Sequence, residues 1–223
     1  RYTFTPANSG FVDRACSGNL PVLLTLTPRN KIYDGGETIY SAQGRRAFAA
    51  FVLEIARRYP CVSAFEIGNE INAHSLKGRM VEQMPASYIA IMQAVHDAIK
   101  PVHPRIMLLS GSSLSVATGF FERLWRAGLA PIIDGVVVHP YLAVPEQLPA
   151  QLVRLSPIIT KGGNAKPVWV SEFGFYYPTP EAAPPHALKM MVLLSAAGVE
   201  RADWYALRDE KFYPNMGLFA NGK

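Results

Sequence analysis

The sequence predicts an α/β protein of the (β/α)8 TIM-barrel class, present here as an incomplete barrel. Short apolar runs alternate with segments of helical periodicity, and no glycine-rich phosphate-binding turn follows the first run. Runs that are apolar on both faces indicate a parallel sheet covered by helices, built from right-handed βαβ units. A doubly wound nucleotide-binding sheet would carry a G-x-G-x-x-G turn, so the barrel is the preferred architecture.

Six runs rich in Val, Ile and Leu are the predicted strands. They are Leu20–Thr27, Cys61–Gly68, Arg105–Ser110, Ile133–His139, Val168–Phe173 and Ala202–Leu207. A complete barrel has eight strands and typically about 250 residues, whereas this chain has 223. We therefore expect residues 1–223 to form a single truncated catalytic barrel domain that lacks roughly strands 1 and 2 and helix 8.

Between the strands, apolar residues recur at the spacing of one helix face. The stripes are Phe48, Phe51, Val52, Ile55 and Tyr59; then Ile89, Met92, Val95 and Ile99; then Leu148, Leu152, Leu155 and Ile159; and finally Leu188, Met191, Val192 and Ser195, ending near Gly198. Another helical segment is expected just before Cys16.

Composition limits the partners of the chain. Its 22 basic and 17 acidic residues give a formal charge of +5, but the basic residues are scattered singly or in pairs. This pattern is typical of a solvated surface, so nucleic acid is not expected as a partner. No apolar run reaches the roughly 20 residues of a membrane span. The oligomeric state stays open.

Two cysteines lie where the barrel would place its amino-terminal face. Cys16 precedes the strand Leu20–Thr27, and Cys61 opens the next strand. A disulfide and two buried thiols are both compatible with this placement. A disulfide would favour a periplasmic or secreted protein. No signal-peptide pattern occurs in the segment.

Two acidic side chains close predicted strands at the end where barrel active sites form. Glu70, preceded by Asn69, follows one strand, and Glu172 closes another. Such a pair suits retaining glycoside hydrolysis, in which one carboxyl protonates the leaving oxygen and the other attacks the anomeric carbon. We predict a raised pKa for Glu70 as acid/base and a lower pKa for Glu172 as nucleophile. By strand alternation, Glu66 would share the face of Glu70 and need a buried partner.

Aromatic and imidazole side chains occupy two further strand ends. His139 and Tyr141 are two residues apart, so strand alternation would point both side chains toward the same pocket. A phenol beside a carboxylate can donate a hydrogen bond that keeps the carboxylate ionised. Trp204 and Tyr205 offer ring faces on which a sugar stacks. The other histidines, His74, His96, His103 and His186, show no ligand spacing and are expected at the surface, so no metal or cofactor is expected. The segment 176–180 is either a sugar-lining loop or an ordinary proline-rich turn.

These motifs together resemble the clan A retaining glycoside hydrolases, and family 39 is the nearest match. The resemblance lies in Glu-Ile-Gly-Asn-Glu, His-Pro-Tyr, Ser-Glu-Phe-Gly and Trp-Tyr-Ala-Leu-Arg-Asp. It implies a carbohydrate substrate, cleaved by double displacement in a poly- or oligosaccharide. Two positions depart from the clan pattern: Gly68 stands where a Trp is usual, and Ile71 stands where a Pro is usual.

The resemblance also implies a role for each candidate residue. Glu70 is implied as the acid/base, Asn69 as a ligand of the sugar 2-hydroxyl, and Glu172 as the nucleophile. His139 and Tyr141 are implied to contact either the sugar or the catalytic groups, and Trp204 or Tyr205 to line the subsite.

Two other functions share this inventory. A non-hydrolytic carbohydrate-binding barrel would use the same acids as hydrogen-bond acceptors, although the full pairing of acids argues against it. A transglycosylase would use every one of these residues, and the sequence does not separate it from a hydrolase. Nor does the sequence fix the sugar, the linkage, or endo against exo action.

Overall fold

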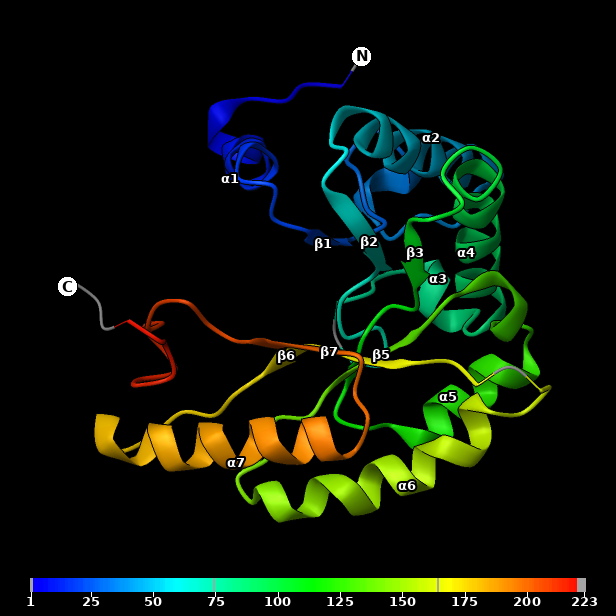
Figure 1. The fold of residues 1–223 in the computed structure, drawn as a ribbon. Helices are drawn as coiled ribbons and strands as arrows, with labels where there is room; N and C mark the ends of the chain where they lie inside the picture. Colours follow the sequence, from blue (N-terminus) through cyan, green and yellow to red (C-terminus); the bar gives the residue numbers. More distant parts are fainter. Residues whose placement is uncertain (1, 74, 164, 220–223) are drawn as a thin grey trace. The chain divides into compact units, whose positions relative to one another are not determined.

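The computed structural model describes residues 2–73, 75–163 and 165–219, which divide into two compact units. The first unit comprises residues 1–111 and 123–135, and the second comprises residues 112–122 and 136–223. Each unit holds a parallel sheet with helices along it (Figure 1). The predicted α/β class with parallel strands is confirmed. Closure into a barrel, and a single catalytic domain, remain predictions.

The first unit contains a three-stranded parallel sheet in the order β1-β2-β3. Its strands are β1 (Val22–Leu26), β2 (Val62–Ile67) and β3 (Met107–Leu109). The edge strand β1 is only half-buried, whereas β2 is buried along nearly its whole length. Near-continuous burial is the reason that β2 reads as an unbroken apolar run rather than an alternating one.

Two long helices form the core of this unit, namely α2 (Ala42–Arg58) and α4 (Ala86–Ile99). The remaining helices are α1 (Pro6–Ser17), α3 (Arg79–Glu82) and the short 3-10 turns η1 (Asp34–Gly36) and η2 (Ala130–Ile132). Ser41 begins α2 by accepting a hydrogen bond from the Gly44 amide at 3.0 Å, as helix caps do. The predicted stripe of α2 is buried except for the half-buried Phe51.

The second unit contains a four-stranded parallel sheet in the order β4-β5-β6-β7. Its strands are β4 (Ser113–Leu114), β5 (Val136–His139), β6 (Val168–Phe173) and β7 (Arg201–Trp204). Its helices are α6 (Leu148–Ile159) and α7 (Ala183–Ala196), with the 3-10 turns η3 (Pro145–Gln147) and η4 (Pro180–Ala182). The helix α5 (Thr118–Arg126) begins in this unit. Neither β4 nor α5 was predicted, since β4 is only two residues long.

The apolar stripes of α6 and α7 had different outcomes. All four residues predicted to face inward on α6 are buried. On α7 the predicted face was wrong, because Met190 and Leu194 are buried while Leu188 and Val192 are 65% and 57% exposed. Apolar residues surround α7 on every side, so its sequence carries no single stripe from which the buried face can be deduced.

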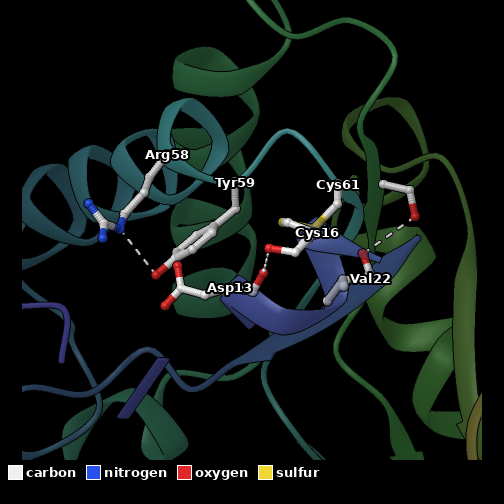
Figure 2. The surroundings of a disulfide bond; sticks show 8 residues. Asp13, Cys16, Val22, Arg58, Tyr59 and Cys61 are labelled. Carbon is white, nitrogen blue, oxygen red and sulfur yellow. Dashed lines mark hydrogen bonds between the residues drawn. A yellow bond between two sulfur atoms is a disulfide. The ribbon is translucent and has the colours of Figure 1, made fainter. Parts of the chain in front are cut away.

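A disulfide joins Cys16 to Cys61, with their Cα atoms 5.0 Å apart (Figure 2). Cys16 lies in the last turn of α1, and Cys61 directly precedes β2. Only Ser9, Gly10 and Val12 of α1 are buried, so packing holds this helix weakly and the bond tethers it to the amino end of β2. Of the two alternatives that the sequence left open, the disulfide is the one formed. Among the described residues, no helix is both long and apolar enough to cross a membrane.

Candidate active site

The carboxyl end of β6 departs from regular pairing where it presents Glu172. Trp169 and Val170 pair with consecutive residues of β7, but the next pair joins Phe173 to Trp204. Three steps along β6 therefore match two steps along β7, which is a bulge at Ser171 and Glu172. Bulges bend a strand and re-aim its side chains, often beside active sites.

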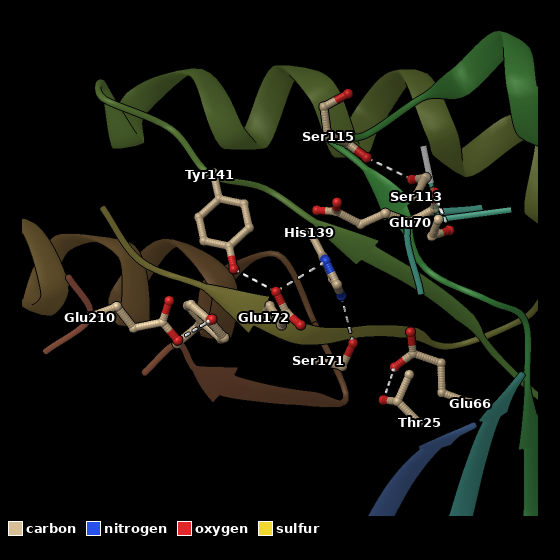
Figure 3. Close-up of polar contacts among 12 residues, drawn as sticks. Thr25, Glu66, Glu70, Ser113, Ser115, His139, Tyr141, Ser171, Glu172 and Glu210 are labelled. Carbon is tan, nitrogen blue, oxygen red and sulfur yellow. Dashed lines mark hydrogen bonds and ion pairs between the residues drawn. The ribbon is translucent and has the colours of Figure 1, made fainter. Parts of the chain in front are cut away.

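Glu172 accepts a hydrogen bond from the segment that follows β5. The Tyr141 hydroxyl donates to Glu172 Oε2 at 2.6 Å, and His139 Nδ1 lies 3.5 Å from the same oxygen (Figure 3). His139 and Tyr141 therefore both contact one carboxylate, although β5 ends at His139 and Tyr141 lies beyond the strand. The Glu172 side chain keeps 27% of its surface exposed. A carboxylate that accepts such a hydrogen bond is stabilised in its ionised form.

His139 is the buried member of this group. Burial lowers the pKa of its imidazole to about 4, so the ring is neutral at pH 7. Because an ionised carboxylate only accepts, the single ring proton belongs on Nδ1, facing Glu172. Nε2 then accepts from the Ser171 hydroxyl at 2.9 Å. The contact with Glu172 is thus polar but not an ion pair, and the His139 side chain has no exposed surface.

The two aromatic residues at the end of β7 take different positions. Tyr205 meets Tyr141 edge to face at 6.4 Å between ring centroids, which places it beside the Tyr141–Glu172 pair. Trp204 instead packs edgewise on Phe173 at 5.2 Å, and its indole nitrogen donates to the Met216 carbonyl at 2.9 Å. The ring contacts therefore associate Tyr205, and not Trp204, with this group.

A further carboxylate that the sequence reading missed contacts Tyr205. The Tyr205 hydroxyl donates to Glu210 Oε1 at 2.5 Å. This hydrogen bond, followed by burial, raises the pKa of Tyr205 to about 12. Glu210 lies outside any strand or helix, so periodicity gave no signal for it. Ser171, also missed, could have been suspected only from its place next to Glu172.

The loops after β5 and β6 are joined by an imidazole. His186 Nε2 lies 2.7 Å from the Leu142 carbonyl and donates to it, and His186 Nδ1 lies 2.7 Å from the Tyr177 hydroxyl. Tyr177 is buried, whereas its neighbour Tyr176 is 52% exposed. His186 was expected at the surface but is half-buried, as are His96 and His103. His74 lies outside the described residues.

In the first unit, the chain leaves its extended conformation before it reaches Glu70. β2 ends at Ile67, and positive φ angles follow at Gly68 (97°) and Glu70 (42°). The expectation that strand alternation continues from Glu66 to Glu70 was therefore wrong. Glu66 is fully buried and accepts from the Thr25 hydroxyl at 3.1 Å, which supplies a partner of the kind expected.

Glu70 itself is half-buried, like Asn69 before it. Burial raises the pKa of the Glu70 carboxyl above its ordinary value, the direction expected from the sequence. Its main-chain carbonyl accepts hydrogen bonds from the Ala73 amide at 2.9 Å and the Ser75 hydroxyl at 3.1 Å. Of the predicted site residues, Asn69 and Glu70 belong to the first unit, and the other five to the second.

The fold is one found in glycoside hydrolases of known structure, although no protein-family model and no curated protein matches the sequence. One similar structure is a GH53 catalytic domain from Ignisphaera aggregans, with a TM-score of 0.69 and 15% identity over 89% of this chain and 66% of that chain. A β-xylosidase from Caulobacter crescentus gives 0.70 and 16% over 98% of this chain and 54% of that chain.

A glucosidase from Croceicoccus marinus gives a TM-score of 0.72 and 13% identity over 90% of this chain and 46% of that chain. At such identities the likeness is one of fold. The chain spans between 46% and 66% of the length of these three proteins.

Proposed function

We propose that this chain carries the catalytic residues of a retaining glycoside hydrolase that acts on a poly- or oligosaccharide. Glu172 is the nucleophile that attacks the anomeric carbon. Glu70 first protonates the leaving oxygen and then, as a base, activates the water that releases the sugar. The mechanism requires the two carboxyl groups to come within about 5–5.5 Å of each other.

The hydrogen bond from Tyr141 to Glu172 is the observation that carries this proposal. A nucleophile has to be ionised, and a phenol at 2.6 Å favours the ionised form. His139, neutral and buried, adds a second polar contact without adding a positive charge that would weaken the nucleophile.

Glu70 has the opposite environment, as an acid requires. Burial raises its pKa, so the carboxyl holds its proton to higher pH than an exposed glutamate does. Two carboxyl groups whose surroundings favour opposite protonation states are typical of an acid and nucleophile pair. Asn69 beside it is proposed to bind the sugar 2-hydroxyl, and Tyr205 to line the subsite.

The fold and the motifs support a finer assignment. We propose a (β/α)8 barrel of clan A, nearest to family 39, on the motifs at four strand ends and on the fold shared with the glycosidases above. The Cys16–Cys61 disulfide supports a periplasmic or secreted location, because disulfides persist in oxidising compartments.

The test is a hydrolysis assay of the full chain on a panel of aryl glycosides and glycans. Glu172→Gln should abolish turnover, and Glu70→Gln should slow substrates with poor leaving groups by about 10²–10⁴-fold. Glu146→Gln, at an exposed carboxylate paired with Lys189, is the matched control and should be unaffected.

Other outcomes decide against parts of the proposal. Glycan binding without hydrolysis sensitive to Glu172→Gln would favour the carbohydrate-binding alternative. Inversion of the first product anomer, followed by NMR, would overturn the retaining mechanism. Sugar transfer that exceeds hydrolysis would identify a transglycosylase.

A further inference from the structure

A buried phenol links the segments at the carboxyl ends of β2 and β3, just before Glu70. Tyr88 lies in the first turn of α4 and is completely buried. Its hydroxyl donates to the Ile67 carbonyl at 2.8 Å and accepts from the Gly111 amide at 2.6 Å. Regular pairing of β2 with β3 stops at Glu66 and Leu109, so the hydroxyl links the strands immediately beyond the end of their ladder.

The bridge depends on a neutral hydroxyl. Only a neutral phenol both donates and accepts, whereas a phenolate would lose the bond to the Ile67 carbonyl. Burial raises the pKa of Tyr88, and the nearby Glu66 raises it further. The Tyr88 hydroxyl is therefore neutral at pH 7, and both halves of the bridge are present there.

Ile71 locks the same turn from the other side. A Cβ on Gly68 would lie 2.5 Å from Ile71 Cγ2, and a Cβ on Gly111 would lie 2.8 Å from that same methyl. Ile71 is buried and occupies space that both glycines leave open. Gly68 and Ile71 are also the two positions that depart from the clan pattern. They depend on each other, because the Ile71 side chain packs in the space that a side chain at position 68 would fill.

Glu70 has a conformation that needs such support. At a φ of 42° it lies in the left-handed region, which non-glycine residues enter at a cost. Such residues persist only where the surroundings determine them, and they are frequent at functional sites.

We propose that Tyr88 is a positioning residue for the acid/base. Its hydroxyl, with Ile71 packed against Gly68 and Gly111, fixes the turn that presents Asn69 and Glu70. The inference rests on the proposed role of Glu70, so its test includes one measurement that is independent of activity.

The first measurement is amide hydrogen exchange of residues 67–73 in the full chain. Tyr88→Phe removes only the bridging oxygen and should speed exchange there by about tenfold. Tyr59→Phe is the matched control: Tyr59 is also buried and in the same unit, but its hydroxyl accepts from the Arg58 side chain. Unchanged exchange in Tyr88→Phe would overturn the proposal.

The second measurement compares kcat/KM for aryl glycosides with poor and good leaving groups. If the acid is displaced, kcat/KM for the glycoside with the poor leaving group should fall about tenfold more than kcat/KM for the one with the good leaving group. Only the poor leaving group needs its oxygen to be protonated as it departs. Faster exchange with an unchanged ratio in an active enzyme would overturn the role toward Glu70. Faster exchange in a chain that hydrolyses nothing would sustain the positioning of the turn and reject the proposed function instead.

A second variant covers the case in which Tyr88→Phe does not fold. Ile71→Leu keeps the side-chain volume but removes the Cγ2 methyl that lies beside both glycines. It should speed exchange in residues 67–73 and lower the same kcat/KM ratio, and its failure to speed exchange would overturn the proposal.

Discussion

Tyr141 donates a hydrogen bond of 2.6 Å to Glu172, although the two residues are 31 positions apart in the sequence. Parallel pairing of β5 with β6 brings their carboxyl ends together, and His139 reaches the same oxygen from β5. His139 at the end of β5, Tyr141 two residues further on and Glu172 in β6 thus form one polar group, in which the carboxylate is partly exposed.

Replacing Tyr141 by Phe should weaken Glu172 in its proposed role as nucleophile. A hydrogen bond to a charged group contributes about 1.5–3 kcal/mol, so kcat/KM should fall about 10- to 100-fold. Without the donor, the ionised form of Glu172 loses a stabilising hydrogen bond, so the acidic limb of the pH profile of kcat/KM should move to higher pH. Tyr177→Phe, whose hydroxyl binds His186 instead, should leave the limb in place; a limb unmoved in both variants would contradict this account.

His139 should make the fold sensitive to mild acid. Its pKa is about 4 in the folded chain and about 6.5 when unfolded, so between these values the unfolded state binds a proton that the folded state does not. Stability is therefore complete above pH 6.5 and declines as the pH falls toward 4, by up to about 3 kcal/mol. Urea unfolding from pH 7.5 to 4.5 measures this decline. The His139→Asn variant should show a smaller decline, and equal slopes would refute the assignment.

Loss of the disulfide should destabilise the first unit. The bond closes a loop of 45 residues, and native disulfides of this kind contribute about 2–4 kcal/mol. The Cys16→Ala/Cys61→Ala double variant should lower the urea midpoint accordingly, and reduction of the wild type should have the same effect. Reductant applied to the double variant is the control and should change nothing.

Gly68 should tolerate no side chain. At φ 97°, Gly68→Ala would be strained, and its new methyl would press on Ile71. We expect a loss of about 2–4 kcal/mol in unfolding free energy, from left-handed strain and overpacking together. Gly119→Ala is the contrasting change, since a Cβ there meets open space within α5; it should be neutral or stabilising by about 0.5–1 kcal/mol. Equal effects at the two glycines would disprove this explanation.

The sequence predicted strand order, parallel pairing and most helices because buried strands and one-sided helices leave strong patterns. All six predicted strands are present, with ends displaced by a few residues. The buried face of α7 was missed because its apolar residues lie all around the helix. The strand β4 was missed because a strand of two residues is too short to show an alternating pattern.

For the candidate site, the meeting of His139, Tyr141 and Glu172 followed from their places at the ends of parallel strands. The turn at Gly68 to Glu70 did not follow, because alternation was extended past the point where β2 ends. Glu210 and Tyr88 lay beyond prediction for another reason: their partners are fixed by loops and by a helix start, which leave no spacing in the sequence.

The extra residue in β6 allows two consecutive side chains to contact the same neighbour. In a regular strand Ser171 and Glu172 would point to opposite faces, yet both contact His139. Removing one residue here would restore a regular ladder with Phe173 still opposite Trp204, but the one residue left between Val170 and Phe173 could not supply both contacts with His139. The placement of the Glu172 side chain therefore depends on the number of residues between Val170 and Phe173 as well as on the side chains at positions 171 and 172. A one-residue deletion should abolish a site that many substitutions nearby would only weaken.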